Sequence, residues 1–289
     1  MRENEVFTLQ NGKKLGYAKY GADEGTPLFH FHGTGSSRLE GKLFHTKGLE
    51  KNIRIITIDR PGFGLSDFQN RKLLEWPDTV LELAQFLEIK KFSIMGISGG
   101  GPHCIVCAYK IPERLRNCIA IGTPGPPEIE TKHFPWLLRV QGWIFKHFPF
   151  TYRQYMKMIS KTSSDPEQLR NFTRKHKKRY PPADAKFILE DSGENLQLIT
   201  RAIREGTQHT FKGAVHEMKL FSSSWGFQLQ DISPNQKIIL WHGEDDLTFN
   251  AAKEMNEIIP NCEARFFPNE GHFSVYMNYL EELFQQLLT

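Results

Sequence analysis

Short apolar runs alternate with segments of helical periodicity along most of the 289-residue chain. Several of these runs are almost continuously hydrophobic, as strands buried on both faces of a sheet should be. They occupy residues 26–33, 53–59, 91–96, 115–122, 237–243 and 263–268. Apolar residues recur at helical spacing in residues 76–89, 101–115 and 274–288. The alternation predicts an α/β fold with a mostly parallel, doubly wound sheet.

Two segments depart from this alternation. Residues 1–21 predict an antiparallel hairpin that turns at Asn11-Gly12. Residues 126–225 begin in the proline-rich run TPGPPE and continue as a helical and aromatic segment without strand period. We predict that residues 126–225 form a helical cap inserted after the sixth strand. Residues 1–125 and 226–289 would then form the core.

The composition is that of a soluble globular protein, with 39% apolar and 24% charged residues. No window approaches the roughly 18 apolar residues of a membrane span, so we expect no stable membrane insertion. The first 21 residues carry charges throughout and do not resemble a signal peptide, which favours a cytoplasmic location. Cys104 and Cys107 form a C-x-x-C, which we interpret as packed core thiols because no second cysteine pair accompanies them.

Positive charge is concentrated in the predicted cap. The whole chain has a net charge of +4, whereas residues 126–225 contain 17 Lys and Arg against 10 Asp and Glu. The densest part is RKHKKRY, residues 174–180, which is typical of a solvated helix face. No nucleic-acid-binding module accompanies it, so we expect no nucleic-acid partner.

The run GISGGG, residues 96–101, fits the pattern G-x-S-x-G through Gly96, Ser98 and Gly100. It follows a predicted strand and precedes a predicted helix, which is the context of a nucleophile on a sharp strand-to-helix turn. Two alternatives remain at this point: Ser98 could be a simple helix N-cap, or the glycines could bind a phosphate. The phosphate alternative lacks both the G-x-G-x-x-G spacing and a Gly-Lys-Ser/Thr ending.

A serine nucleophile needs a base, and the base needs an orienting acid. His272 lies in PNEGHFS after the last predicted strand, and WHGEDD places Glu244, Asp245 and Asp246 after another strand. The carboxyl ends of parallel strands share one edge of the sheet, where the turn with Ser98 should also lie. The chain order Ser98, Asp246, His272 is the order expected for a triad on a doubly wound sheet.

An acyl intermediate also needs N–H donors for its oxyanion. We expect one donor to be the backbone N–H of Gly99, directly after the nucleophile, and the second to be that of Thr34 in FHFHGTGSS. His30 and His32 form an H-x-H pair, but no carboxylate or cysteine lies nearby in the sequence. A metal site is therefore not expected, and no other cofactor is implied.

Taken together, these residues resemble the α/β-hydrolase superfamily. The motifs that carry the resemblance are HGTGSS (32–37), DRPGFGLS (59–66), GISGGG (96–101), HGEDD (242–246) and GHFS (271–274). The resemblance implies that Ser98 is the nucleophile, His272 the base and Asp246 the acid, with Thr34 and Gly99 forming the oxyanion hole. Asp246 is preferred because family members usually carry the acid three residues beyond the glycine that matches Gly243.

The resemblance also narrows the expected chemistry. It implies a structural loop at DRPGFGLS, so Asp59 and Arg60 are not expected to be catalytic. HGTGSS lacks the H-G-G-P-G of proline iminopeptidases, and haloalkane dehalogenases carry Asp where this chain has Ser98. The expected activity is hydrolysis of a carboxylic ester or related small acyl substrate through an acyl-enzyme on Ser98.

Several alternatives remain open at the level of the sequence. The same fold could serve as a catalytically idle ligand receptor or signalling protein, or as a C–C bond hydrolase or perhydrolase with the same triad. Trp136, Trp143 and Phe145 of the cap could contact the acyl group, but most cap aromatics could equally hold the cap on the sheet or form a lid that touches lipid. The sequence does not determine the oligomeric state.

Overall fold

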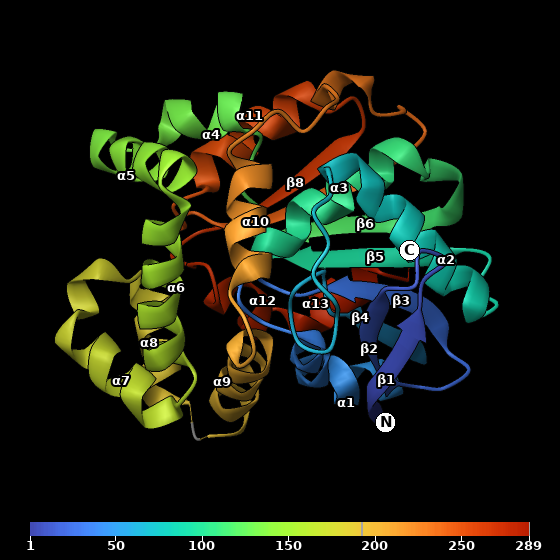
Figure 1. Ribbon diagram of the computed structural model, residues 1–289, viewed down its shortest axis with the longest axis horizontal. Coiled ribbons are helices and arrows are strands. Elements are labelled where there is room, and N and C mark those ends of the chain that lie inside the picture. Colours follow the sequence, from blue (N-terminus) through green and yellow to red (C-terminus); the bar gives the residue numbers. More distant parts are fainter. Residues whose placement is uncertain (192, 289) are drawn as a thin grey trace.

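The structure is a computed structural model that describes residues 1–191 and 193–288, with one sheet at its centre (Figure 1). The strands of this described chain are β1 (Arg2–Thr8), β2 (Lys14–Gly21), β3 (Thr26–Phe31), β4 (Ile53–Ile58), β5 (Phe92–Ile97), β6 (Leu115–Ile121), β7 (Ile238–Gly243) and β8 (Cys262–Phe267). Their order in the sheet is β1-β2-β4-β3-β5-β6-β7-β8. Strands β3 to β8 run parallel, and β2 pairs antiparallel with both β1 and β4. The predicted fold class is confirmed.

Helices cover both faces of the sheet because successive strand residues point to opposite sides. The two sets are α2 (Trp76–Phe86), α3 (Gly101–Lys110) and α11 (Phe249–Ile258) on one face, and α1 (His45–Glu50), α12 (Ser274–Asn278) and α13 (Leu280–Gln286) on the other. Phe29 and Phe31 of β3 pack in the cluster that contains Trp76 of α2, whereas Leu28 packs in the cluster that contains Phe284 of α13. The near-continuous hydrophobicity of β3 follows from this double burial.

The two ends of the chain test two further predictions. The hairpin forms as expected: β1 pairs with β2, and Gly12 takes a left-handed φ of 78° in the turn between them.

The C-terminal helix, predicted as one segment over 274–288, is instead divided into α12 and α13. Tyr279 leaves the helical conformation at φ −120° and ψ 29°, and its ring packs 4.5 Å from that of Phe267. The hydrophobic periodicity of residues 274–288 does not reveal such a break, because both helices present apolar residues to the same core.

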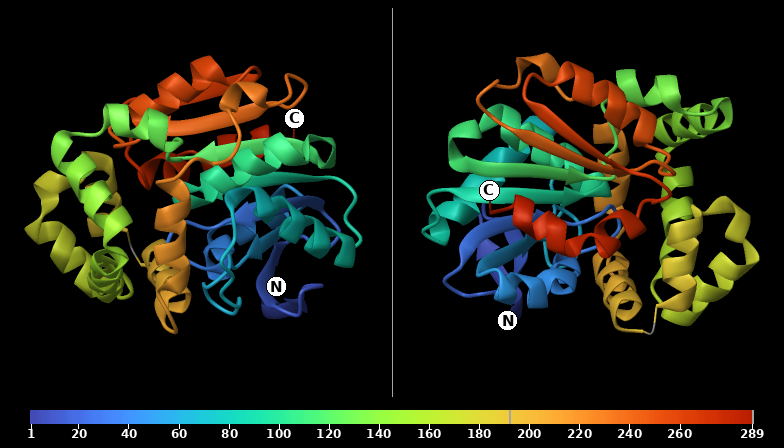
Figure 2. Two further views of the ribbon diagram at one scale, coloured as in Figure 1. Left: turned by 45° about the horizontal axis from the view of Figure 1, so that its top comes forward. Right: turned by 180° about the vertical axis from the view of Figure 1, so that it is seen from behind.

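Residues between β6 and β7 form a group of helices on one side of the sheet, which we call the cap after the predicted insertion (Figures 1 and 2). In the described chain these helices are α4 (Pro127–His133), α5 (Trp136–His147), α6 (Pro149–Ser163), α7 (Pro166–Lys175), α8 (Pro182–Glu190), α9 (Glu194–Thr207) and α10 (Lys212–Phe221). Four of them begin at a proline, which is favoured in the first turn because its missing N–H would have no partner there. Among the described helices, none combines the length and the hydropathy needed to cross a membrane.

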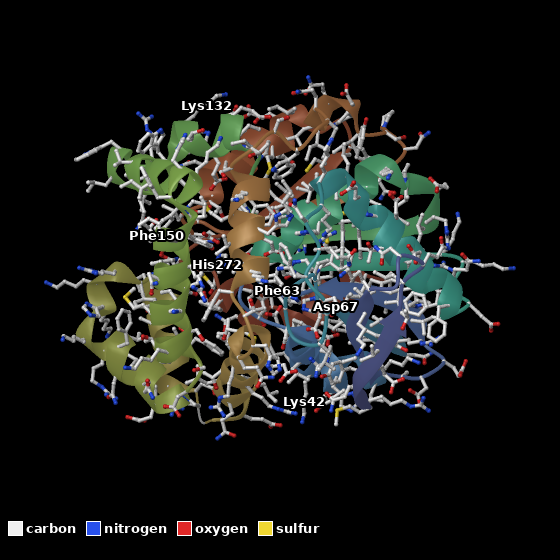
Figure 3. All side chains as sticks on the ribbon, in the orientation of Figure 1. Lys42, Phe63, Asp67, Lys132, Phe150 and His272 are labelled. Carbon is white, nitrogen blue, oxygen red and sulfur yellow. The ribbon has the colours of Figure 1, made fainter. Side chains whose placement is uncertain are left out.

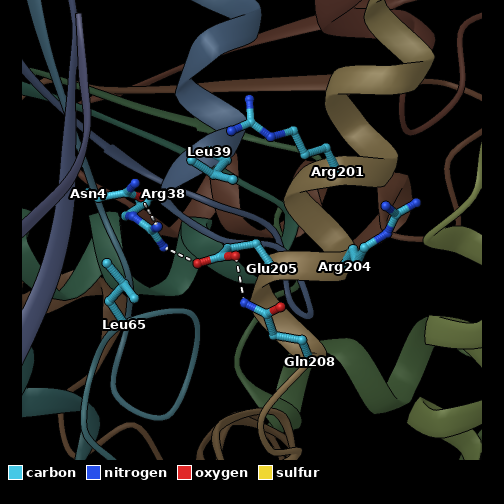
Figure 4. A pocket seen from close by; sticks show the side chains of 8 residues that line it. All are labelled: Asn4, Arg38, Leu39, Leu65, Arg201, Arg204, Glu205 and Gln208. Carbon is cyan, nitrogen blue, oxygen red and sulfur yellow. Dashed lines mark hydrogen bonds and ion pairs between the residues drawn. The ribbon is translucent and has the colours of Figure 1, made fainter.

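A buried arginine links α9 to the core. The guanidinium of Arg38 donates a hydrogen bond of 2.9 Å to Asp59. It also donates to Glu205 of α9 at 2.8 Å and to Asn4, and these two contacts are drawn in Figure 4. Arg38, Asn4 and Glu205 line a cavity of about 610 Å³, and Arg201 lines it as well. Because the carboxylates of Asp59 and Glu205 compensate the buried charge of Arg38, the contact fixes α9 against the sheet.

Asp59 itself organises the loop that follows β4. Its carboxylate accepts hydrogen bonds from the backbone N–H of Arg38 at 2.6 Å and of Leu65 at 2.8 Å, besides the ion pair with the Arg38 side chain. Both partners of this ion pair are buried. The loop thus has the structural role that its sequence suggested.

We expect Asp59→Ala to lower the free energy of unfolding by about 3–5 kcal/mol, because it leaves the Arg38 charge buried and only partly compensated. Urea denaturation monitored by circular dichroism measures this. The matched control is Asp78→Ala, which removes an exposed partner of Lys110 and should leave the midpoint nearly unchanged. Equal effects of the two substitutions would contradict a structural role for Asp59.

Candidate active site

Ser98 lies on a sharp turn between β5 and α3. It has a left-handed φ of 53°, which is strained for a residue with a side chain. A Cβ on Gly96 would overlap the carbonyl oxygen of Gly100, and a Cβ on Gly100 would overlap that of Phe31 in β3. The turn therefore requires glycine on both sides of the serine. The one-turn 3-10 helix over Ser98–Gly100 and the following α3 begin without a side-chain cap, so Ser98 does not serve as the N-cap considered above.

The ends of β7 and β8 bring Asp246 and His272 together. Asp246 Oδ2 lies 2.7 Å from His272 Nδ1, and Asp246 Oδ1 accepts the backbone N–H of Thr248 at 3.0 Å. Asp246 is buried, whereas the neighbouring Asp245 is exposed. A carboxylate at Nδ1 holds the proton on that nitrogen and leaves Nε2 as the basic atom.

The electrostatics of this pair favour its charged form. Burial alone would lower the pKa of His272, but the carboxylates of Asp246, Asp184 and Glu40 raise it above the usual histidine value. Burial alone would raise the pKa of Asp246, but the imidazole of His272 and its hydrogen bond lower it. The two opposite shifts have one cause, the attraction between an imidazolium and a carboxylate at hydrogen-bond distance.

His272 reaches the edge of the sheet that carries Ser98. A Cβ on Gly122, directly after β6, would lie 3.0 Å from both Cε1 and Nδ1 of the imidazole. Within residues 1–191 and 193–288, the structure contains no hydrogen bond between the Ser98 hydroxyl and His272. Such bonds are often long in unliganded sites and shorten when substrate binds.

The two expected oxyanion donors also lie together. A Cβ atom added to Gly99 would lie 3.2 Å from the backbone nitrogen of Thr34. The turn after β3 therefore packs directly on the turn after β5. The Gly99 carbonyl accepts a hydrogen bond from His103 Nδ1 at 3.0 Å, with the pKa of His103 held well below its usual value by burial. The carbonyl is thereby directed into the protein, away from the Ser98 side of the turn.

Glu217 of α10 is a buried residue that no sequence motif indicated. Its carboxylate accepts a hydrogen bond from the Thr34 hydroxyl at 3.1 Å and forms an ion pair with the Arg60 guanidinium. Arg60 also donates to the backbone carbonyl of His32. The cap therefore contacts the turn that carries Thr34, the first of the two expected oxyanion donors.

Asp184 of α8 holds the loop that carries His272. Its carboxylate accepts three backbone N–H groups, those of His272 at 2.8 Å, Phe273 at 2.9 Å and Ser274 at 2.8 Å. These donors open helix α12, whose first N–H groups would otherwise have no partner. Asp184 is almost completely buried. No sequence motif indicates Asp184, because its partners lie about 90 residues away and are backbone atoms.

The remaining candidate ligands have structural partners. His30 Nε2 lies 3.0 Å from Glu40, whereas His32 lies 2.7 Å from the Gly33 carbonyl and accepts the Arg60 N–H at 3.3 Å. The two rings thus do not converge on one point. Cys104, Cys107 and Cys118 are free and buried in the core. Across the described residues, no group of three or more His, Cys, Asp or Glu side chains is arranged to hold a metal ion.

The three cap aromatics expected near the substrate lie on different faces of α5. Phe145 is half-buried and packs its ring 5.1 Å from that of Tyr152 and 5.3 Å from that of Tyr155 on α6. Trp136 and Trp143 lie on the opposite, exposed face of the helix, where Trp143 stacks on His147. Figure 3 shows Phe150 on the cap and His272 near the boundary between the cap and the sheet.

The comparison with known families agrees with this geometry. The family model for the alpha/beta hydrolase fold matches residues 27–279. The chain belongs to the alpha/beta hydrolase fold family. The match covers β3 to α12, and therefore includes all the strand ends that carry Thr34, Ser98, Asp246 and His272.

Two curated relatives show how this member compares with others. The chain is 25% identical over 283 residues to the dihydrolipoyllysine-residue acetyltransferase component of the acetoin cleaving system of Pseudomonas putida, and 31% identical over 153 residues to the uncharacterized hydrolase YcgS of Bacillus subtilis. The alignments cover 96% and 50% of this chain. They cover 66% and 52% of the relatives, so the chain spans between about half and two thirds of the length of these proteins.

Solved structures share the fold over nearly the whole chain. A hydrolase from Pseudomonas aeruginosa superposes with a TM-score of 0.68 at 16% identity, covering 99% of this chain and 97% of the other. An esterase from Exiguobacterium antarcticum gives a TM-score of 0.66 at 16% identity, covering 99% and 98%. At such identities the similarity concerns the fold.

The three N–H groups held by Asp184 provide a test of its role. Asp184→Ala should accelerate amide hydrogen exchange in the peptide containing residues 272–274 and lower the free energy of unfolding by about 2–4 kcal/mol, because buried donors lose a charged acceptor. Glu190→Gln on the same helix is the control, since Glu190 is exposed. Unchanged exchange in Asp184→Ala would contradict the proposed contact.

The shifted pKa of His272 can be measured directly. Nuclear magnetic resonance titration should give His272 a pKa above the usual value of about 6.5, and Asp246→Asn should lower it by removing the negative charge at Nδ1. The exposed neighbour provides the control: Asp245→Asn should leave the titration of His272 nearly unchanged. If the pKa of His272 in Asp246→Asn equals that in the wild type, the Asp246 carboxylate is not its electrostatic partner.

Proposed function

We propose that this protein is a serine hydrolase that cleaves a carboxylic ester or related small acyl compound through an acyl-enzyme on Ser98. The observation that carries the proposal is the convergence of three strand ends at one sheet edge. Ser98 is held there on a left-handed turn, and the pair of Asp246 and His272 lies at the same edge. A nucleophile and an oriented base are the two parts that this chemistry needs.

In the proposed reaction, His272 Nε2 removes the proton from Ser98 Oγ as Oγ attacks the carbonyl carbon of the substrate. Asp246 keeps the Nδ1 proton in place and stabilises the imidazolium that forms. The tetrahedral intermediate then expels the alcohol, which takes the proton from His272. A water molecule deprotonated by His272 attacks the acyl carbon, and the acid is released as the proton returns to Ser98 Oγ.

The backbone N–H groups of Thr34 and Gly99 are the proposed donors to the oxyanion. Loss of one such donor typically raises the barrier by about 2.7–4 kcal/mol. The contact between Thr34 and Glu217 supports the proposal because it restrains the turn that carries this donor. Gly99 lies in the first turn of the helical segment that leads into α3, so its N–H also benefits from the positive end of the helix dipole.

The substrate class rests on similarity and on the cap. Esterases are among the proteins with this fold, and a 109-residue part of the chain is 33% identical to a 2-hydroxymuconate semialdehyde hydrolase of Pseudomonas. We therefore propose an ester first and hydrolysis of a C–C bond second. For the acyl group we favour contact with the packed side of α5, where Phe145 meets Tyr152.

The nucleophile can be tested by a fluorophosphonate, which reacts with activated serine hydroxyls. The wild type should form an adduct on the peptide that contains Ser98, and Ser98→Ala should form none and lose activity toward p-nitrophenyl acetate by roughly 10⁴-fold or more. The exposed Ser223 gives the control: Ser223→Ala should react as the wild type does.

The same experiment separates the alternatives. A wild-type protein without adduct or turnover would favour an idle ligand receptor. Full activity in Ser98→Ala would show that another residue is the nucleophile. Profiling the active protein with esters of increasing acyl length, amides and vinylogous 1,5-diketones would then distinguish ester from C–C bond hydrolysis.

A further inference from the structure

Helix α5 carries apolar side chains on two opposite faces, and only one of them is packed. Leu138 and Phe145 are half-buried on the side of α6. The other face is a stripe of large exposed residues at helical spacing. Its members, with their exposed fractions, are Trp136 (67%), Leu137 (61%), Val140 (47%), Trp143 (57%) and Ile144 (36%). We call these five residues the α5 stripe.

The α5 stripe is distinctive within this protein. The chain has five tryptophans, of which Trp76, Trp225 and Trp241 are buried. The two exposed ones both lie in the stripe. A continuous exposed surface of large apolar residues usually marks a contact with another apolar phase or protein.

The helices around the stripe are strongly basic. Residues 136–180 contain 11 Lys and Arg against two Asp and Glu, a net charge of +9, which leaves −5 for the rest of the chain. Residues 174–180 and Pro182 line a groove of about 790 Å³. In the described chain, Lys175, Lys177 and Lys178 form no ion pair with a carboxylate, and all three are exposed. We call residues 174–179 the basic segment.

Helix α6 lies between the stripe and the basic segment. Helix α6 contacts both α5 and α7, and α7 leads directly into the basic segment. All three ribbon views place α5 and α7 at the margin of the cap, away from β1 (Figures 1 and 2). The margin of the cap thus includes both the helix that carries the exposed tryptophans and the helix that leads into the uncompensated positive charge.

We propose that this side of the cap docks the protein peripherally on a bilayer that contains anionic phospholipids. The α5 stripe would enter the boundary between headgroups and acyl chains, where tryptophan is favoured. The lysines and arginines of the basic segment and of α6 would bind the lipid phosphates. The inference does not depend on the proposed hydrolase activity.

Charge distinguishes a lipid surface from two other occupants. In a symmetric dimer over this face, the basic helices of both copies would be brought together, and like charges repel at such distances. A nucleic acid would bind the basic segment but leave the α5 stripe in water. An anionic bilayer binds both features at once.

Vesicle flotation tests the proposal. The purified protein should float with vesicles of phosphatidylglycerol and phosphatidylcholine at low salt, but not with vesicles of phosphatidylcholine alone, and binding should fall as salt rises. Tryptophan emission should shift to the blue on binding, because Trp136 and Trp143 leave water. Absence of binding to the anionic vesicles at low salt would overturn the proposal.

Two matched pairs of variants locate the surface. Leu137→Asp should weaken binding to the anionic vesicles at least about 10-fold, whereas Leu49→Asp, at an exposed leucine of α1, should bind as the wild type does. The double variant Lys177→Glu, Lys178→Glu should also bind at least about 10-fold more weakly, with Lys90→Glu, Lys91→Glu as its control. The circular dichroism spectrum and the midpoint of thermal unfolding should be the same in all four variants.

Three other outcomes would overturn the proposal. Equal binding by Leu137→Asp and Leu49→Asp would exclude the α5 stripe. A wild-type dimer in solution that becomes monomeric in Leu137→Asp would identify the face as a contact between copies. Binding of DNA or RNA at the same salt, insensitive to Leu137→Asp and with no binding to vesicles, would identify a nucleic-acid surface.

Discussion

The close approach of the β5–α3 turn to the ends of its neighbouring strands is the constraint on which the site depends. Ser98 can adopt its left-handed conformation only because Gly96 and Gly100 leave room for backbone atoms that a Cβ would displace. The same contact brings Gly99 against Thr34, so that the proposed nucleophile and the two proposed oxyanion donors lie close together. The strain is sustained by a parallel sheet buried on both faces.

The cap contributes to this arrangement through buried carboxylates. Asp184 binds three N–H groups of the loop that carries His272, and Glu217 binds Thr34 and the buried Arg60. A buried charge is tolerated only when it has partners, so each carboxylate fixes the segment that it contacts. The cap therefore restrains the loop that carries His272 and the turn that carries Thr34.

The charge of the molecule is divided between its two parts. The net positive charge lies in the cap, which also exposes aromatic residues, whereas the net charge of the rest of the chain is slightly negative. Exposed aromatic side chains and uncompensated lysines are each tolerated in water. Their combination on the cap is what the proposed contact with an anionic bilayer requires, because such a bilayer is both apolar and negatively charged.

The sequence by itself determined the strands, the doubly wound sheet, the insertion of helices after the sixth strand and the residues gathered at one sheet edge. It could do so because burial on both faces leaves a continuous apolar run, and because parallel strands present their carboxyl ends together. Only the tertiary structure decided where the last helix breaks at Tyr279, and that Asp184 and Glu217 reach the core. The contacts of these two carboxylates join residues 88 to 183 positions apart, three of them through backbone N–H groups, and such pairing leaves no periodic trace in the chain.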